Sequence, residues 1–508
     1  MNASDLPPVL VVGAGIMGAG IAQVAAQAGH RVMLFDARDA AAATARDKLG
    51  QTLHGLVAKG RLSAEAADAA LARIAPIARL EEAADAGLVV EAIVENLEAK
   101  RALLRQLEAL VSAEAVLASN TSSISITALA NGLRVPGRVV GMHFFNPVPL
   151  MKLVEVVSGL QTDAAVAERV FALATAWGKT AVHARSTPGF IVNRIARPYY
   201  AETLALLQER ASTPAVLDAC LRGAGFRMGP CELMDLIGHD TNFSVTESVY
   251  QANFGDKRFQ PSLVQREMVD GGLLGRKSGR GFYAYGEGAP APTLPAPRGS
   301  ALPASVRWHG AGAGGAAVTT FGQRWCDALA AAGVAVELAE GSGWIGLEAG
   351  AARLALTDGR TATERAQAEG CAELVLFDLP IAELPAGAAL ACAGARSASE
   401  PWLDQAAALL ACAGVVPQQL DDAPGLVVAR TVAMLVNEAA DAVQQGVCST
   451  EGADLAMKLG VNYPAGPFEW LARWEAAAIV ALIDRLDAFY RGERYRVSPW
   501  LRRRGSAR

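Results

Sequence analysis

A histidine and a glutamate stand twelve positions apart in the stretch MHFFNPVPLMKLVEVV, residues 142–157. An imidazole has an unperturbed pKa near ~6.5, so a neutral His143 can accept a proton near neutral pH. A turn at Asn146-Pro147-Val148-Pro149 would bring Glu155 beside it, where a carboxylate can fix the ring tautomer and stabilise the imidazolium. On spacing alone, a structural histidine beside an apolar strand is the commoner arrangement, and Glu155 would then be a solvent-facing strand residue.

Three glycines form a second pattern, G-x-G-x-x-G, in the stretch VLVVGAGIMGAGIA. The pattern follows a hydrophobic run, opens a helical segment and is followed by Asp36 at the end of the next apolar run, which together indicate a dinucleotide site. Gly13 would permit a tight turn, Gly15 the approach of a pyrophosphate, and Gly18 close helix–strand packing. Free N–H groups at the helix start would face the phosphates. The predicted cofactor loop comprises Gly13, Gly15, Ile16, Met17 and Gly18.

The acidic residue Asp36 predicts which dinucleotide is bound. A carboxylate at this position can accept hydrogen bonds from a ribose diol and would repel a 2′-phosphate, so NAD is expected rather than NADP. Arg38, two residues further on, is close enough to weaken that preference. The alternative is a glycine loop in a sheet protein that binds another ligand or none.

Several polar residues follow apolar runs at the points where strands are expected to end. Glu95 lies in AIVEN, Asn120 and Ser122 lie in SNTSS, and His143 follows RVVGM. In an open α/β sheet, ligands bind outside the carboxyl ends of the strands, so these side chains should converge on one crevice. Ser122 could hydrogen-bond an alcohol substrate, and Asn193 could hold that substrate from the opposite wall. No cluster with the spacing of metal ligands is present, so we expect no metal.

The elements that must position these residues change in character along the chain. Strand-like and helix-like segments alternate up to about residue 185, which predicts an α/β domain with a mostly parallel sheet. The expected parts are an NAD-binding Rossmann domain at 1–186, a helical domain at 187–287, a Pro/Ala/Gly-rich linker at 288–304, a degenerate Rossmann-like α/β block at 305–420 and a second helical domain at 421–508.

The second helical segment repeats the first. PGFIVNRIARPYYAETLALLQ, from residue 188, aligns with PGLVVARTVAMLVNEAADAVQ, from residue 424, and MGPCELMD, from 228, aligns with AGPFEWLA, from 465. The offset changes by one residue between the two matches, which indicates a duplication. Asn193 corresponds to Ala429, so the second copy is expected to be structural.

The composition excludes several classes of function. The chain has 508 residues, 52% of them hydrophobic, and 46 Lys and Arg against 51 Asp and Glu. The net charge of −5 gives no electrostatic reason to expect a nucleic acid partner. Seven scattered cysteines without a C-x-x-C motif fit reduced thiols in the cytoplasm. We see no signal peptide and no apolar stretch long enough to cross a membrane.

The other five histidines are expected to be structural. His30 precedes a strand and His54 lies on a helix face, whereas the last three have no obvious partner in the sequence: His183, His239 and His309.

Five motifs taken together resemble the L-3-hydroxyacyl-CoA dehydrogenases over about residues 8–287: GAGIMGAGIAQ, VEAIVENLEAKRALLRQLE, ASNTSSISIT, GMHFFNPVPLMKLVEVV and STPGFIVNRI. The resemblance implies oxidation of a (3S)-3-hydroxyacyl-CoA to a 3-ketoacyl-CoA, with NADH as second product. His143 resembles the general base of that family and Glu155 its carboxylate partner. Ser122 and Asn193 match substrate-contacting positions. Positions matching the dinucleotide site or its surroundings are Asp36, Glu95, Lys100, Asn120, Ser122 and Asn146.

The extra helical copy resembles longer bacterial members of this family, among them 3-hydroxybutyryl-CoA and 3-hydroxyadipyl-CoA dehydrogenases, the latter associated with phenylacetate breakdown. In short members two helical domains pair across a dimer, so the second copy is expected to pack on the first within one chain. A homodimer of the whole chain is a further expectation. The stretch WHGAGAGGAA, from residue 308, is weakly similar to a glycine loop, but we expect no second NAD site there.

Two other functions compete with the dehydrogenase. An NAD-binding structural or sensor protein could use the same fold, and loss of His143 or Glu155 would have favoured it, but both are present. A fused protein with an additional hydratase activity is disfavoured because the chain begins directly with the glycine loop.

Overall fold

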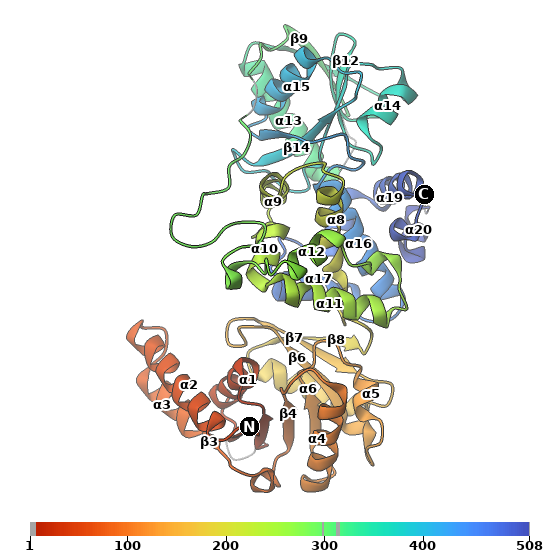
Figure 1. The fold of residues 1–508 in the computed structure, drawn as a ribbon. Coiled ribbons are helices and arrows are strands. Elements are labelled where there is room, and N and C mark those ends of the chain that lie inside the picture. Colours follow the sequence, from red (N-terminus) through yellow and green to blue (C-terminus); the bar gives the residue numbers. More distant parts are fainter. Residues whose placement is uncertain (1–6, 297–298, 311–314, 507–508) are drawn as a thin grey trace. The chain divides into compact units, whose positions relative to one another are not determined.

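The computed structural model describes residues 7–296, 299–310 and 315–506. The chain forms two compact units (Figure 1). The first contains the residues up to 194 together with 446–461, and the second contains 195–445 together with 462–508. The predicted second helical copy, 421–508, is therefore divided between the two units.

An eight-stranded sheet forms the centre of the first unit, with strand order β3-β2-β1-β4-β5-β6-β7-β8. The neighbouring strands from β3 to β6 run parallel, which confirms the predicted α/β class. Strand β7 pairs antiparallel with β6 and parallel with β8. The strands are β1 (Val9–Val12), β2 (Val32–Phe35), β3 (Ile74–Pro76), β4 (Leu88–Glu91), β5 (Val116–Ser119), β6 (Val139–Phe144), β7 (Leu153–Ser158) and β8 (Thr180–Arg185).

Several helices of this unit begin at a residue whose side chain caps them. The Asn96 side chain accepts a hydrogen bond from the backbone N–H of Ala99, 2.9 Å away, and so starts α4. Helix α1 begins directly after Gly15, the second glycine of the loop. The helices are α1 (Ile16–Gln27), α2 (Ala41–Ala58), α3 (Ala64–Ala72), α4 (Leu97–Leu110), α5 (Ile126–Ala130), α6 (Ala164–Ala176), α7 (Val192–Ile195) and, from the far end of the chain, α17 (Thr450–Gly460).

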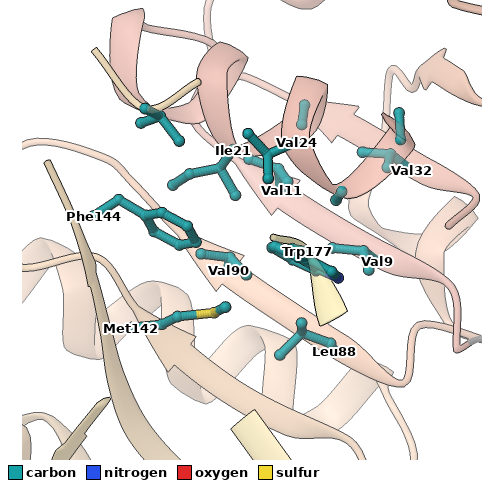
Figure 2. Packing of buried hydrophobic residues seen from close by; sticks show 14 of the residues in the cluster. Val9, Val11, Ile21, Val24, Val32, Leu88, Val90, Met142, Phe144 and Trp177 are labelled. Carbon is teal, nitrogen blue, oxygen red and sulfur yellow. The ribbon is translucent and has the colours of Figure 1, made fainter. Parts of the chain in front are cut away.

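Alternation along two strands decides which side chains can reach a ligand. Met142 and Phe144 of β6 point into the hydrophobic core, where they lie near Val90 and Trp177 (Figure 2). Val154 and Val156 of β7 belong to the same core. Since successive side chains of a strand point to opposite faces, the residues between them, His143 and Glu155, share the other face of the sheet.

Helices from both repeat copies pack together in the second unit. Helix α8 (Arg197–Gln208) lies against α16 (Val428–Gln444), and the buried Glu202 accepts a hydrogen bond from Arg430 at 2.9 Å. The predicted pairing of the two copies within one chain is thus confirmed. The other helices here are α9 (Pro214–Gly223), α10 (Pro230–Ile237), α11 (His239–Ala252), α12 (Leu263–Asp270), α18 (Pro467–Trp474), α19 (Ala476–Tyr490) and α20 (Pro499–Gly505).

The predicted α/β block is a seven-stranded mixed sheet with strand order β10-β9-β11-β12-β13-β14-β15. Trp325 and Phe377 are fully buried in its core. Of its expected glycine loop, residues 311–314 lie outside the described ranges. The elements are β9 (Ser305–His309), α13 (Gly315–Ala331), β10 (Ala335–Ala339), β11 (Gly346–Ala349), β12 (Ala352–Leu356), α14 (Ala362–Glu369), β13 (Leu374–Phe377), β14 (Ala389–Gly394), α15 (Glu400–Cys412) and β15 (Val416–Gln419).

The sequence repeat has a counterpart in backbone conformation. Phe190 and Leu426, which align, are both left-handed, with φ of 47° and 51°. Few non-glycine residues adopt positive φ, so this shared feature supports a common origin. The copies differ at Pro198, which lacks an N–H and lies in the first turn of a new helix, α8, whereas α16 continues unbroken. Within the described residues, no helix is both long and apolar enough to span a membrane.

Candidate active site

His143 and Glu155 face each other across the antiparallel pair β6–β7. The Nδ1 atom of the ring lies 2.5 Å from the Oε2 atom of the carboxylate, and the carboxylate is fully buried. Its other oxygen, Oε1, accepts the backbone N–H groups of Ile191 and Val192 at 3.0 and 2.9 Å. The carboxylate is therefore fixed on both sides, and the predicted turn brings it to the histidine.

The second ring nitrogen of His143 is the one left for a reacting group. Among the described residues, Nε2 makes no hydrogen bond, whereas Nδ1 is held by Glu155. A carboxylate at Nδ1 keeps the proton on that nitrogen and leaves a lone pair on Nε2. The rings of Phe145 and Phe190 lie 4.6 and 5.8 Å from the imidazole, so apolar side chains restrict its orientation.

One hydrogen-bonded group comprises Glu95 after β4, Ser122 after β5 and Asn193 of α7. Glu95 accepts from the Ser122 backbone N–H at 2.9 Å and from the Ser122 hydroxyl at 3.3 Å. Asn193 donates from Nδ2 to the Ser122 carbonyl at 3.5 Å. The Asn120 side chain accepts the N–H of Phe144 at 2.8 Å, next to His143. The predicted convergence of these strand ends is therefore present.

Glu95 is held in its charged form. Burial alone would raise its pKa, but hydrogen bonds from Thr121, Ser122 and Ser123 and the charge of Lys100 outweigh burial and lower the pKa. The Lys100 ammonium lies 3.4 Å from Glu95. The group is thus anchored by an ionised carboxylate.

Sequence reasoning missed the strongest partner of Lys100. The Lys100 ammonium donates to Glu91, the last residue of β4, at 2.5 Å, and both side chains are buried. The Ser119 hydroxyl also donates to Glu91, at 2.7 Å. An acidic residue that ends an otherwise apolar strand was the available signal, since buried charges are seldom unpaired.

The three loop glycines differ in what their missing side chains make possible. Gly13 has a φ of 104°, which only glycine adopts readily, as a tight turn requires. A Cβ on Gly18 would lie 1.7 Å from the Gly13 carbonyl oxygen, so this glycine allows the close packing of α1. A Cβ on Gly15 would meet nothing within 4 Å. The space at Gly15 is therefore left open by the protein itself, as a dinucleotide phosphate requires.

A cavity of about 430 Å³ borders this loop and extends along α2. Its wall includes Ala14, Gly15 and the strongly exposed Ile16 from the loop, and Arg38 and Lys48 from the region after β2. Met17, by contrast, packs against the core. An open loop next to such a cavity fits the adenosine end of a dinucleotide.

Asp36 lies at the end of β2 and accepts the Ala14 backbone N–H at 2.8 Å. Arg38 binds both of its oxygens, at 3.0 and 3.1 Å. The hydrogen bonds from the Arg38 guanidinium outweigh burial and hold the pKa of Asp36 at about 2. The Arg38 guanidinium is thus held by Asp36, the carboxylate that favours NAD over NADP.

Two other sequence expectations have simple outcomes. Asn146 lies in the turn after β6, next to the cis peptide bond to Pro147, and its exposed side chain makes no hydrogen bond within the described residues.

The three histidines for which the sequence showed no obvious partner each have one in the structure. His239 lies 2.8 Å from Asp235, His183 lies 3.4 Å from Glu168, and His309 stacks on Trp344.

In the second half of the chain, a single carboxylate lies at the place that corresponds to the His143–Glu155 pair. Asp378 follows β13 and accepts the backbone N–H groups of Val427, Val428 and Ala429 at 2.9, 2.6 and 2.9 Å. The backbone N–H of Asp378 donates to the carbonyl of Ala391 in β14 at 2.9 Å. Asp378 therefore continues β13, the strand that corresponds to β6. One buried aspartate thus takes the strand position of His143 and makes the backbone bonds of Glu155.

Known protein families match most of the chain, apart from residues 286–353 between two matched ranges. The model described as 3-hydroxyacyl-CoA dehydrogenase, NAD binding domain, matches residues 8–187. The model described as 3-hydroxyacyl-CoA dehydrogenase, C-terminal domain, matches twice, at 189–285 and 425–508. The chain belongs to the 3-hydroxyacyl-CoA dehydrogenase family. A third model, a 3-hydroxybutyryl-CoA dehydrogenase reduced Rossmann-fold domain, matches 354–424. This dehydrogenase is an oxidoreductase, and its cofactor is NAD, as the sequence predicted.

Relatives of the same length exist within this family. The chain is 43% identical to the 3-hydroxyadipyl-CoA dehydrogenase of Escherichia coli (strain K12) over 502 residues, 98% of each chain. The crystal structure of 3-hydroxybutyryl-CoA dehydrogenase from Escherichia coli K12 substr. MG1655 has a TM-score of 0.88 and 41% identity, covering 99% of this chain and 98% of that one. A shorter relative, the probable 3-hydroxybutyryl-CoA dehydrogenase of Deinococcus radiodurans, is 45% identical over 54% of this chain and 99% of its own length.

Proposed function

We propose that this dehydrogenase oxidises (3S)-3-hydroxyacyl-CoA esters of short or dicarboxylic acyl groups, with His143 as general base and Glu155 as the carboxylate that orients it. The observation that supports these roles is the 2.5 Å contact between Nδ1 and Oε2, which leaves Nε2 as the basic nitrogen. Ser122 and Asn193 are proposed to contact the substrate, because both lie in one hydrogen-bonded group at the end of β5, the strand next to β6.

The proposed reaction moves one proton to His143. Nε2 takes the proton from the 3-hydroxyl group while the C3–H bond breaks, and the ring becomes an imidazolium. Buried Glu155 stabilises that cation across the Nδ1 hydrogen bond, and the N–H groups of Ile191 and Val192 keep the carboxylate from turning away. NAD, when bound, accepts the hydride. The chain must also bind NAD. Gly15 leaves open space for its phosphates, and Asp36 supplies an ionised acceptor for the ribose diol.

The acyl group is proposed from the relatives, whose names include both a hydroxyadipyl and a hydroxybutyryl substrate. NADH absorbance should therefore rise with NAD and (3S)-3-hydroxybutyryl-CoA or (3S)-3-hydroxyadipyl-CoA. The panel should include matched acyl chains with and without a terminal carboxylate. A higher kcat/KM for the dicarboxylic substrate supports the adipyl assignment. NAD binding without turnover of any acyl-CoA would contradict the enzyme and favour a sensor protein on the same fold.

The cellular setting is also proposed. All seven cysteines are free thiols and lie within the described residues, which fits a reducing cytoplasm. The two helical copies already pair within one chain, so a homodimer would have to use another surface. Sedimentation velocity measures the mass directly and tests that expectation.

A further inference from the structure

A segment of the second helical copy belongs to the unit that contains His143. Residues 446–461 are part of the first compact unit, although their neighbours in sequence are part of the second. The backbone N–H of Arg185, the last residue of β8, donates to the Val447 carbonyl at 2.9 Å. Helix α17 follows and packs against β7 and β8. More than 250 residues separate this helix from the strands that it covers.

The last residue of α17, Gly460, has no room for a side chain. A Cβ there would lie 2.7 Å from Cδ2 of Leu153 and 3.0 Å from Cγ2 of Val192, closer than real Cβ atoms ordinarily come. It would also lie 3.6 Å from the ring of Phe145. Gly460 itself is buried. A methyl group at this position must therefore displace at least one of its neighbours.

Each of these three neighbours borders the catalytic pair. Leu153 is two residues before Glu155 on β7. Val192 donates its N–H to Glu155 at 2.9 Å. The Phe145 ring lies 4.6 Å from the His143 ring. Displacement of any of them alters the packing around the carboxylate or the imidazole.

The second unit contains the equivalent contact with the copies exchanged: there, a helix of the first copy packs against a strand of the α/β block. Helix α9 of the first copy ends at Gly223, whose Cβ would lie 2.6 Å from the carbonyl oxygen of Ala389, the first residue of β14. The backbone N–H of Asp421 donates to the Ala211 carbonyl at 2.9 Å.

The repeat alignment makes these contacts equivalent to those of the first unit. It pairs Arg185 with Asp421 and Val447 with Ala211, and it pairs Gly460 with Gly223 after the one-residue change of offset. Each helical copy thus contributes one helix that packs on the sheet associated with the other copy. The exchange is a feature of the duplicated architecture and is seen twice in one chain.

We propose that Gly460 is a positioning residue for the His143–Glu155 pair, and that the second helical copy completes the catalytic unit through α17. The role as a positioning residue rests on the proposed function, because it concerns the same pair. The first copy cannot cover β7 and β8 itself, since its own equivalent helix, α9, lies against β14.

The test compares two glycine-to-alanine substitutions in one helix. Gly460→Ala adds a methyl group against β7, whereas the nearest atoms to a Cβ on Gly452 are Ser449 Oγ at 3.3 Å and Cys448 Cβ at 3.7 Å, both within the same segment. Both substitutions replace a helical glycine by alanine, which has the higher helix propensity. We expect Gly460→Ala to lower kcat about tenfold or more with the KM for NAD little changed, and Gly452→Ala to leave kcat within about twofold.

A second measurement on the same proteins does not depend on turnover. The imidazole resonances of His143, identified by their loss in His143→Gln, should shift in Gly460→Ala and stay in place in Gly452→Ala. If wild-type protein oxidises no acyl-CoA but these resonances shift, the positioning role stands and the proposed function fails. A folded Gly460→Ala protein with wild-type kcat and unshifted resonances overturns the positioning role.

If Gly460→Ala does not fold, Leu153→Val and the double variant Leu153→Val/Gly460→Ala replace it. Valine has no Cδ atom, so the tightest contact is removed while those to Val192 and Phe145 persist. A shift of the His143 resonances between these two proteins supports the proposal, and identical resonances contradict it.

Discussion

Glu155 and His143 occupy directly opposed positions on β7 and β6, and the carboxylate is held from its other side by the backbone of the segment that enters α7. The carboxylate therefore links the sheet to the segment that carries Asn193. This arrangement favours a carboxylate over an amide at residue 155. Only a carboxylate can accept from Nδ1 and from two backbone N–H groups at once.

Glu155→Gln should lower kcat on the order of 10²- to 10⁴-fold, by analogy with the loss of an orienting carboxylate in hydrolase triads. The amide oxygen can still accept from Ile191 and Val192, but the amide NH₂ would face Nδ1 and favour the tautomer protonated on Nε2. That nitrogen could then not act as a base. Stopped-flow NADH formation measures the effect, with Glu168→Gln, at the exposed partner of His183, as matched control. Wild-type kcat in Glu155→Gln would refute the orienting role.

Gly15→Ala and Gly18→Ala should separate cofactor binding from stability. A methyl group on Gly15 meets no protein atom, so the variant should fold normally but bind NAD at least ~10-fold more weakly, because the phosphates need that space. A methyl group on Gly18 would overlap the Gly13 carbonyl, so this variant should lose about 1–3 kcal/mol of stability or more. Thermal unfolding and NAD titration check both. Equal behaviour of the two variants would contradict the assignment.

Asp36→Ala should reduce the preference for NAD over NADP by roughly 10- to 100-fold, the equivalent of a hydrogen bond to a charged group at about 1.5–3 kcal/mol. The substitution also frees Arg38 to meet a 2′-phosphate. The ratio of kcat/KM values for the two cofactors is the measurement. Unchanged selectivity would assign the choice to another group. Arg38→Ala, which leaves the carboxylate in place, is the control.

The pH dependence of Asp36 follows from its pKa of about 2, below the ordinary 3.8. A depressed pKa means that its contribution to stability is present above the unfolded value and is lost as the pH falls through about 2. The stability difference between wild type and Asp36→Ala should therefore be constant from pH 5 to 8 and vanish only in strong acid. Its size should be below about 1 kcal/mol, because Arg38 is largely exposed. A difference that changes near neutral pH would contradict this pKa.

Lys100→Met should destabilise the first unit by about 3–5 kcal/mol, because Glu91 would be left buried without its counter-charge. Glu91→Gln/Lys100→Met should recover part of the loss, since neither charge then remains. Thermal unfolding of the three proteins is the measurement. If the double variant were less stable than Lys100→Met, the pair could not be the reason for the loss.

The sequence allowed much of the catalytic sheet to be predicted, and the reason is local. Gly13, Gly18 and Asp36 are required by a turn, a close contact and a strand end within one βαβ unit, so their spacing carries the information. The His143–Glu155 contact was predictable because a short turn joins the two strands. Their alternation with the core residues Met142, Phe144 and Val154 was visible in the same stretch.

The remainder depends on contacts between distant parts of the chain. Glu91 gave only a weak signal, since its partner Lys100 follows in a helix whose facing direction the sequence does not specify. The contact of Gly460 with β7 could not be predicted, because the repeat shows that two helical copies exist but not which sheet each helix covers. The partner of His183 was missed because it lies on a separate helix, whereas Asp235 is only four residues before His239 and could have been considered from the sequence.

The central claim is that Nε2 of His143 removes the hydroxyl proton, and His143→Gln tests it most directly. Single-turnover NADH formation from (3S)-3-hydroxybutyryl-CoA or (3S)-3-hydroxyadipyl-CoA should slow by ~100-fold or more. NAD affinity and the unfolding temperature should change little, and His183→Gln should react at the wild-type rate. A His143→Gln protein that forms NADH as fast as wild type would contradict the account.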